Sequence, residues 1–380
     1  MVTQWVIKVS KFCNLRCDYC YEFPELGNRA RMSQEDASAM FANMAAFYAH
    51  QPGTQVQCVW HGGEPLLQEP GYFHMLLAEQ KRWLGGLDVR NVVQTNLTVL
   101  DESRIALLRD RFDGVGVSVD LFGNHRLNLA GRPSQDRVLA NLDRLQEAKV
   151  RFGCITVLTR RTIPHLESIF RFYERANLSF RVLPLFRGAT NDQNAGFQVG
   201  AREVLDALCR LFDLWLASPT HISVAPLSDL LAQLVRRRAG DEPDYYDRRH
   251  WEEVVVVNTN GDLYADADAY LPGRSWGNIF KTPLTELLGG AEWERSVRDA
   301  ELRMAAVCTS CEYFGACTGY AVAEDSRDYD DCVDSGGRRR CIVERGVCAH
   351  IERRLDEAGA DGRIDASLWS RSGELLGLGV

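Results

Sequence analysis

Short apolar runs of strand length alternate with amphipathic segments through the first half of the chain. The runs are rich in Val, Ile and Phe, a composition typical of buried β-strands. Between them, apolar residues recur three or four positions apart, as at Met40 and Met44, and Ser33 with Asp36 forms a helix-capping pattern. The predicted strands cover residues 4–10, 55–60, 89–95, 114–119, 151–158 and 179–184, and the predicted helices follow Ser33 and cover residues 72–84, 101–112, 134–149 and 163–177.

This alternation predicts a parallel sheet, because parallel neighbours need a crossover connection and a helix usually supplies it. Six strand–helix units are fewer than a closed eight-stranded barrel needs. The expected fold class is therefore α/β, a partial (β/α)6 barrel of the TIM type with a smaller C-terminal cysteine-rich domain. In that architecture, chemistry lies on loops after the strand ends, and the first such loop covers residues 11–31.

The second half of the chain has a different pattern. Residues 201–239 look helical without strands, and a polar stretch with Pro243 follows, which predicts a linker. A strand at 254–257, a hairpin turn at Asn260-Gly261 and a cysteine-rich segment at 308–348 come next. The predicted division is a barrel at 1–200, a helical connection at 201–245, a second domain at 246–357 and a tail at 358–380.

Composition narrows the class of protein. The 380 residues are 46% hydrophobic and 25% charged, as in ordinary globular proteins, and the net charge of −8 disfavours nucleic acid as a partner. No apolar stretch approaches the ~20 residues of a membrane span, and no charged leader precedes an apolar core, so we expect no membrane partner and a cytoplasmic location. In a reducing compartment, the twelve cysteines are better explained as metal ligands and core residues than as disulfides.

Three cysteines in the first predicted loop carry the strongest chemical signal. Cys13, Cys17 and Cys20 have the spacing C-x-x-x-C-x-x-C, which lets them converge on one cubane iron–sulfur cluster. Such clusters normally take four thiolates, so one iron would stay open to chelate S-adenosylmethionine (SAM). A structural zinc site is the alternative, but zinc prefers four protein ligands in paired knuckles, and no second pair lies nearby.

These residues resemble the radical SAM superfamily, and further motifs follow the next three strands. The resemblance implies that a 4Fe-4S cluster and SAM bind in the barrel, with Tyr19 near the adenine. Gly62-Gly63-Glu64 is similar to the family's GGE motif, whose paired glycines let backbone carbonyls approach the SAM amino group. The remaining residues expected at the cofactor are Asn96, Ser118, Asp120 and Arg126.

The second domain resembles the SPASM domain of radical SAM maturases such as the anaerobic sulfatase-maturating enzymes. Cys308, Cys311 and Cys317 reproduce most of its core, and the resemblance implies one auxiliary 4Fe-4S cluster. Ala265 and Ala321 stand where the family has cysteines, so we expect the other auxiliary cluster to be absent. The fourth thiolate is expected from Cys341, with Cys348 and Cys332 as rivals, and zinc on the same thiolates is the alternative.

An auxiliary cluster would accept an electron from an oxidised substrate, which favours net oxidation. Asp266 aligns with the family's candidate base, although a solvated hairpin carboxylate is an equal alternative. We expect a maturase that crosslinks side chains of a ribosomally made precursor peptide, with an electron donor such as a flavodoxin or ferredoxin. Recognition of a leader peptide would need either a separate leader-binding protein or the second domain. The alternatives are radical oxidation of a small molecule, such as a sugar or amino acid derivative, and a non-catalytic zinc adaptor.

Overall fold

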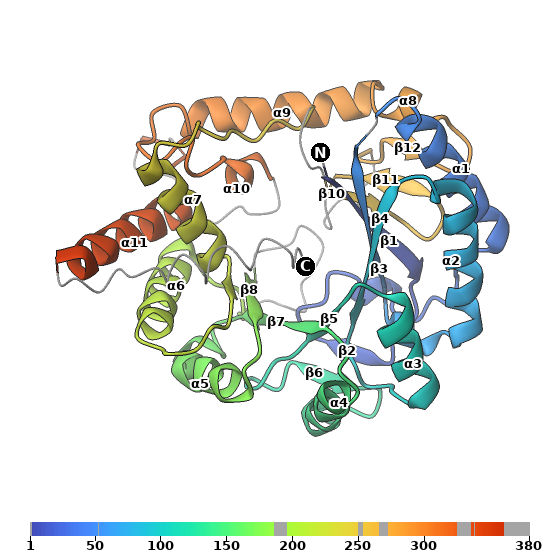
Figure 1. Ribbon diagram of the computed structural model, residues 1–380, viewed down its shortest axis with the longest axis horizontal. Helices are drawn as coiled ribbons and strands as arrows, with labels where there is room; N and C mark the ends of the chain where they lie inside the picture. Colours follow the sequence, from blue (N-terminus) through green and yellow to red (C-terminus); the bar gives the residue numbers. More distant parts are fainter. Residues whose placement is uncertain are drawn as a thin grey trace.

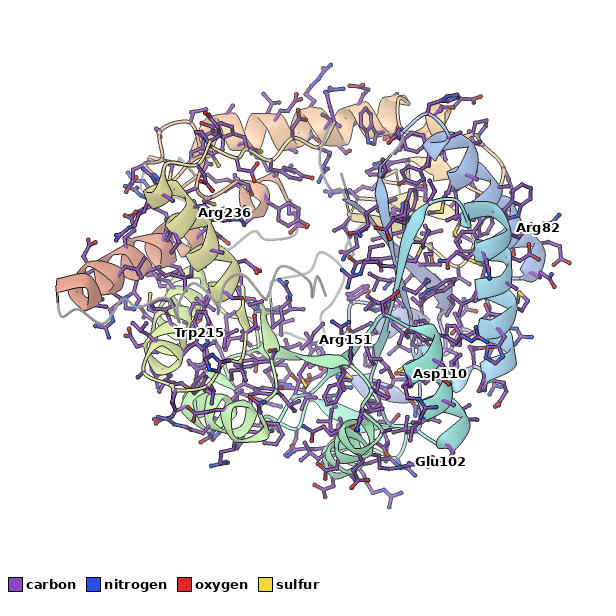
Figure 2. All side chains as sticks on the ribbon, in the orientation of Figure 1. Arg82, Glu102, Asp110, Arg151, Trp215 and Arg236 are labelled. Carbon is purple, nitrogen blue, oxygen red and sulfur yellow. The ribbon has the colours of Figure 1, made fainter. Side chains whose placement is uncertain are left out.

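The protein folds as one curved sheet with helices on its outer side (Figure 1). The computed structural model describes residues 2–51, 53–185, 196–249, 254–265, 273–324, 336–337 and 339–360. Charged side chains of the outer helices, such as Arg82 and Glu102, lie at the periphery (Figure 2). Within the described ranges, every helix is too short or too polar to cross a membrane.

All six predicted strands form, and they lie side by side in parallel in chain order, which confirms the partial barrel. They are β1 (Val2–Ser10), β3 (Gln55–Gly62), β4 (Asp88–Thr95), β5 (Gly114–Ser118), β7 (Phe152–Leu158) and β8 (Phe180–Pro184). The helices between them are α1 (Gln34–Tyr48), α2 (Pro70–Leu84), α3 (Glu102–Arg111), α4 (Gln135–Glu147) and α5 (Leu166–Ala176).

The alternation of side chains along each strand separates an outer face from an inner one. Trp5 of β1 donates its indole N–H to Tyr48 of α1, and Trp60 of β3 packs edge-on against Phe41 and Phe73 of α1 and α2. These residues therefore face the helices. Because neighbouring side chains point to opposite faces of a strand, the residues between them face the barrel interior.

The second half of the chain extends the same sheet at both edges. β9 (Val224–Ala225) pairs in parallel with β8, between α6 (Ala201–Leu216) and α7 (Leu227–Ala239), so the prediction of a strand-free 201–239 was wrong. A two-residue strand carries too little pattern to be seen in the sequence. At the other edge, β10 (Val254–Val257) pairs in parallel with β1, and the hairpin adds β11 (Asp262–Tyr264) and β12 (Gly277–Asn278).

The C-terminal helices pack against the barrel at two places. The side chain of Asn43 in α1 bonds three backbone groups of residues 279–284, and Asp213 of α6 pairs with His350 and Arg354. The sheet and these contacts run across residue 245, the predicted boundary between the helical connection and the second domain. The four-part division into domains stays a prediction. The helices here are α8 (Leu284–Leu287), α9 (Ala291–Val307), α10 (Tyr320–Ala323) and α11 (Val343–Ala360).

Candidate active site

The loop after β1 brings Cys13, Cys17 and Cys20 together with Tyr19 in one small apolar cluster. Two short strands, β2 (Leu15–Cys17) and β6 (Arg126–Asn128), pair here, with Cys17 opposite Arg126. The 3-10 helix η1 (Phe23–Glu25) follows the last cysteine. The loop is thus fixed to a segment more than a hundred residues later in the chain, and its three thiols lie at the carboxyl end of the sheet.

Gly62 and Gly63 are required by the close approach of this loop. A Cβ added to Gly62 would lie 2.1 Å from the carbonyl oxygen of Ser10, and one added to Gly63 would lie 2.3 Å from that of Lys11. Gly62 also has a φ of +144°, which L side chains rarely adopt. The backbone N–H of Gly63 donates to Ser10 O at 2.9 Å, so the glycines seat the cysteine loop on the end of β3.

Glu64 joins the ends of β3 and β4 from a buried position. Its carboxylate accepts hydrogen bonds from the Thr95 hydroxyl at 2.7 Å and the backbone N–H groups of Asn96 at 2.6 Å and Leu66 at 2.9 Å. Burial nevertheless raises the pKa of Glu64. Asn96 in turn directs its amide toward the thiol of Cys13 at 3.6 Å, so Glu64 indirectly positions Cys13.

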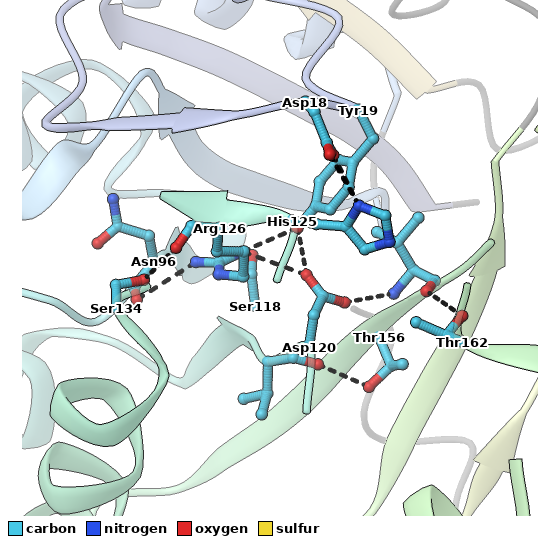
Figure 3. Close-up of polar contacts among 12 residues, drawn as sticks. Asp18, Tyr19, Asn96, Ser118, Asp120, His125, Arg126, Ser134, Thr156 and Thr162 are labelled. Carbon is cyan, nitrogen blue, oxygen red and sulfur yellow. Dashed lines mark hydrogen bonds and ion pairs between the residues drawn. The ribbon is translucent and has the colours of Figure 1, made fainter. Parts of the chain in front are cut away.

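Tyr19, Asp120 and Arg126 form one buried polar group beside the cysteine loop (Figure 3). The Tyr19 hydroxyl donates to Asp120 and accepts from Arg126 at 3.1 Å. Asp120 also accepts from the backbone N–H of Val157 at 2.8 Å, and Ser118 accepts from the amide of Gln94 at 3.0 Å. The structure therefore brings the predicted cofactor residues of three strand ends to one place.

The sequence analysis missed a second polar group on the same loop. Asp18, between Cys17 and Tyr19, accepts from His125 Nδ1 at 2.8 Å (Figure 3). His125 Nε2 lies 2.9 Å from the Thr159 hydroxyl. His125 is 1% exposed. In the sequence, the position of His125 next to Arg126 was the one sign that it lies near the site. The spacing of residues along the chain could not predict that His125 is buried or which groups it bonds.

The residues present fit an iron–sulfur cluster and SAM. Three thiols on one loop leave a fourth ligand position to a small molecule. The Nε atom of Arg126 is buried without a hydrogen-bond partner in the described part of the chain, and it would suit an anionic group such as the SAM carboxylate. Burial raises the pKa of Cys13 to about 12, so the thiol needs a bound cation to become a thiolate ligand.

The C-terminal cysteines line one cavity. Its wall includes Cys308, Cys311, Cys317 and Cys341, and most of its other side chains are apolar. A Cβ on Gly319, whose φ is +86°, would lie 3.3 Å from the Cys308 sulfur, so this glycine leaves room beside the thiol. Four thiols around a cavity are the donor set that a cubane cluster or a zinc ion takes.

The candidates for the fourth thiol lie in different surroundings. Cys341 is in the cavity wall and approaches Glu344 at 3.3 Å. Cys348 is 1% exposed and is not among the residues that line the cavity. Burial and then the nearby Cys317 raise the pKa of Cys348, so this thiol lies close behind the wall. The cavity therefore favours Cys341. Ala321 also lines this cavity, at a position where the family resemblance led us to expect a cysteine. Cys332 and the candidate base Asp266 lie outside the described residues.

Comparison with known proteins agrees with this arrangement. Residues 7–173 match the Radical SAM superfamily model. The chain is 22% identical over 338 residues to the serine-type anaerobic sulfatase-maturating enzyme of Bacteroides thetaiotaomicron, covering 82% of this chain and 80% of that protein. It is 24% identical over 328 residues to the cysteine-type enzyme of Clostridium perfringens strain 13, covering 82% and 86%.

Solved structures show the same fold over nearly the whole chain. The structure of anSMEcpe with bound AdoMet and the Cp18Cys peptide superposes with a TM-score of 0.73 at 18% identity, covering 95% of this chain and 99% of that one. Streptococcus suis SuiB bound to its precursor peptide SuiA gives a TM-score of 0.56 at 15% identity, covering 89% and 76%.

Proposed function

We propose that this chain, a radical SAM enzyme related to the anaerobic sulfatase-maturating enzymes, oxidatively crosslinks side chains of a ribosomally synthesised peptide. The enzyme class already excludes the non-catalytic zinc adaptor. Two of the similar structures were solved with peptides, one with Cp18Cys and one with the precursor peptide SuiA. A peptide is therefore the substrate class that these relatives favour.

The observation that carries the proposal is the second set of four cysteines around its own cavity. Cys13, Cys17 and Cys20 would hold the radical SAM cluster, and Cys308, Cys311, Cys317 and Cys341 would hold one auxiliary 4Fe-4S cluster in a SPASM-like domain. When bound, the first cluster and SAM supply a 5'-deoxyadenosyl radical. A chain that only isomerised its substrate would have no use for a second electron site.

The proposed oxidation would remove two hydrogen atoms from the peptide for each crosslink. One would leave as a hydrogen atom to the radical derived from SAM, which would become 5'-deoxyadenosine. The carbon radical left on the peptide would attack a second side chain to form the new bond, and the product radical would then lose one electron, for which the auxiliary cluster would be the acceptor, and one proton to a base. Asp266 is the predicted base, and a flavodoxin or ferredoxin would accept the electron and supply the one that cleaves SAM.

The barrel residues have separate parts in this proposal. Asp120, Arg126 and the backbone beside Gly62 and Gly63 would bind SAM, while Glu64 and Asn96 would hold the cysteine loop in place. Tyr19 would pack near the adenine, and Ser118 would bind SAM beside Asp120. A cytoplasmic location and a separate leader-binding protein belong to the same proposal.

The test uses anaerobically reconstituted enzyme with SAM, a reductant and the peptides encoded by short reading frames beside its gene. We expect one of them to stimulate 5'-deoxyadenosine release and to lose the mass of two hydrogen atoms per crosslink. Stimulation by a sugar or amino acid derivative, with every peptide unchanged in mass, would instead establish the small-molecule alternative. An auxiliary cluster would serve that oxidation equally well, so the substrate decides between the two.

A further inference from the structure

A buried lysine lies on the inner face of the barrel. Lys8 of β1 and His61 of β3 are partners in the strand register, so their side chains stand next to each other. Trp5 and Trp60 face the outer helices, and the alternation of the strands turns Lys8 and His61 inward. Lys8 is 1% exposed, whereas His61 is partly accessible.

The ammonium group of Lys8 has three donors, and the structure gives each of them an acceptor. They are the Tyr21 hydroxyl, His61 Nδ1 at 3.2 Å and a Glu22 carboxylate oxygen at 3.2 Å. Although burial opposes the charge, Tyr21 and Glu22 raise the pKa of Lys8, so the lysine stays protonated. A buried ion pair of Lys8 and Glu22 thus lies beneath Tyr21 and His61, which are both partly exposed.

This arrangement fixes where the protons of the two upper residues lie. His61 Nδ1 faces the Lys8 ammonium and accepts the backbone N–H of Gly62 at 2.7 Å, so the ring proton is on Nε2. Burial and then the charge of Lys8 lower the pKa of His61 well below its usual value, and the ring is neutral. Tyr21 accepts from Lys8, so its own O–H is left to donate.

Two donors therefore remain: His61 Nε2–H and Tyr21 O–H. Among the described residues, neither of them has an acceptor. Tyr21 directly follows Cys20, the last cysteine of the radical loop, and His61 directly precedes Gly62, which meets the backbone at the start of that loop. A donor pair oriented from below by a buried charge is pre-organised, because the protein and not the ligand has already ordered it.

We propose that His61 and Tyr21, held by Lys8, form a site that binds a carbonyl or carboxylate oxygen of the substrate beside the radical cluster. The inference rests on the proposed function, since it assigns to the peptide an oxygen acceptor near the carbon that loses hydrogen. That oxygen belongs to a backbone amide or to an acidic side chain. Anchoring it fixes the distance between the substrate C–H bond and the radical.

The experiment measures binding without turnover. Ligand-observed saturation-transfer NMR is recorded on reconstituted holoenzyme with SAM, using N-acetylglycine N-methylamide as an amide-only probe and N-acetylglycine as a carboxylate probe. We expect saturable binding of at least one probe. His61→Leu and Tyr21→Phe should each weaken it by about 3- to 10-fold, the range for one lost hydrogen bond.

Two further variants serve as controls. His61→Gln retains an N–H donor and should bind within about threefold of wild type. His165→Gln changes an exposed histidine that stacks on Phe122 and should leave binding unchanged. A probe preference identifies the source of the oxygen, with the amide probe indicating the backbone and the carboxylate probe an acidic side chain.

Two results would overturn the site: wild-type enzyme that binds neither probe, or His61→Leu and Tyr21→Phe enzymes that bind as tightly as wild type. If one variant fails to fold, the other still tests the site. Tyr21→Phe is the milder change, because it keeps the ring and removes only the hydroxyl. The same wild-type preparation is assayed for SAM cleavage. Enzyme that binds the probes but never releases 5'-deoxyadenosine would refute the proposed function and leave this site standing.

Discussion

The two cysteine sites differ in what holds their thiols in place. At the radical loop, the supporting backbone bonds come from distant segments: Asp18 N–H donates to His125 O at 3.2 Å, and Glu64 N–H donates to Phe12 O at 3.0 Å. At the C-terminal site, the N–H groups of the cysteines bond locally, as from Cys311 N–H to Cys308 O at 2.8 Å and from Cys317 N–H to Tyr313 O at 2.7 Å. Distant support reaches only their neighbours, since Asp244 N–H donates to Gly315 O and Tyr246 N–H donates to Thr318 O, both at 2.9 Å. The first site therefore depends on the strand ends of the barrel, and the second on its own turns together with residues 244–246.

The chemistry around the thiols differs in the same way. The radical loop is surrounded by Tyr19, Asp120, Arg126 and Glu64, which can recognise a charged molecule. The C-terminal cavity is mostly apolar apart from its thiols, Glu344 and Arg345. This difference suits the proposed function, in which the first site would bind and orient SAM with polar groups from several strands and the second would only accept electrons, for which ligands and exclusion of water suffice.

The largest expected effect comes from removing the radical thiols. Changing Cys13, Cys17 and Cys20 to Ala should abolish SAM cleavage and remove the iron of one cubane, while the metal of the C-terminal site survives. The measurements are 5'-deoxyadenosine release and iron content after anaerobic reconstitution. Retained 5'-deoxyadenosine release would defeat the assignment of the radical site.

The support from distant segments can be broken without touching a ligand. Gly63→Ala would place a Cβ 2.3 Å from Lys11 O and 2.5 Å from Phe12, so the cysteine loop must move. Because a shift of ~1 Å can cost about 100-fold, SAM cleavage should fall by roughly that factor. The matched control is Gly153→Ala, whose Cβ would meet nothing nearer than 4.0 Å and should leave cleavage unchanged. Equal activity of the two variants would show that the close approach is unimportant.

Replacing the predicted base separates hydrogen abstraction from the later steps. Asp266→Asn keeps the shape of the side chain and removes its basicity, so SAM cleavage should persist while product falls by ~100-fold. Both quantities come from one assay with substrate, by counting 5'-deoxyadenosine and modified product. A normal product yield would return Asp266 to a solvated position on the hairpin.

The smallest expected effect concerns the fourth thiol of the C-terminal site. Reconstituted wild-type protein should hold about eight irons, at four per cubane, and Cys341→Ala should lower that number by up to half. Cys348→Ala should leave the iron content unchanged, since Cys348 does not line the cavity. About twelve irons would contradict the inferred loss of the other auxiliary cluster at Ala265 and Ala321, and about four irons with one zinc would contradict the auxiliary cluster itself.

The sequence predicted the barrel because its strands and helices repeat with strong, separate periodicities. Ser33 and Asp36 form the predicted capping box at the start of α1, and the turn at Asn260-Gly261 closes the hairpin, with Gly261 at a φ of +89°. The addition of β10 beside β1 was not predicted. Its four valines specify a strand, but strand pairing between residues 250 positions apart leaves no local pattern.

The candidate active site likewise has features that the sequence predicts and features that only the tertiary structure fixes. The amino-acid sequence by itself predicted the cysteine loop as the radical site, because three cysteines on one loop need only local spacing to converge on a cluster. Tertiary structure alone decided that Gly62 and Gly63 seat that loop, that His125 holds Asp18, and that Lys8 lies between Tyr21, Glu22 and His61. The reason is physical: ligand spacing is fixed by covalent geometry along a few residues, whereas these contacts exist only once the sheet brings distant strand ends to one edge.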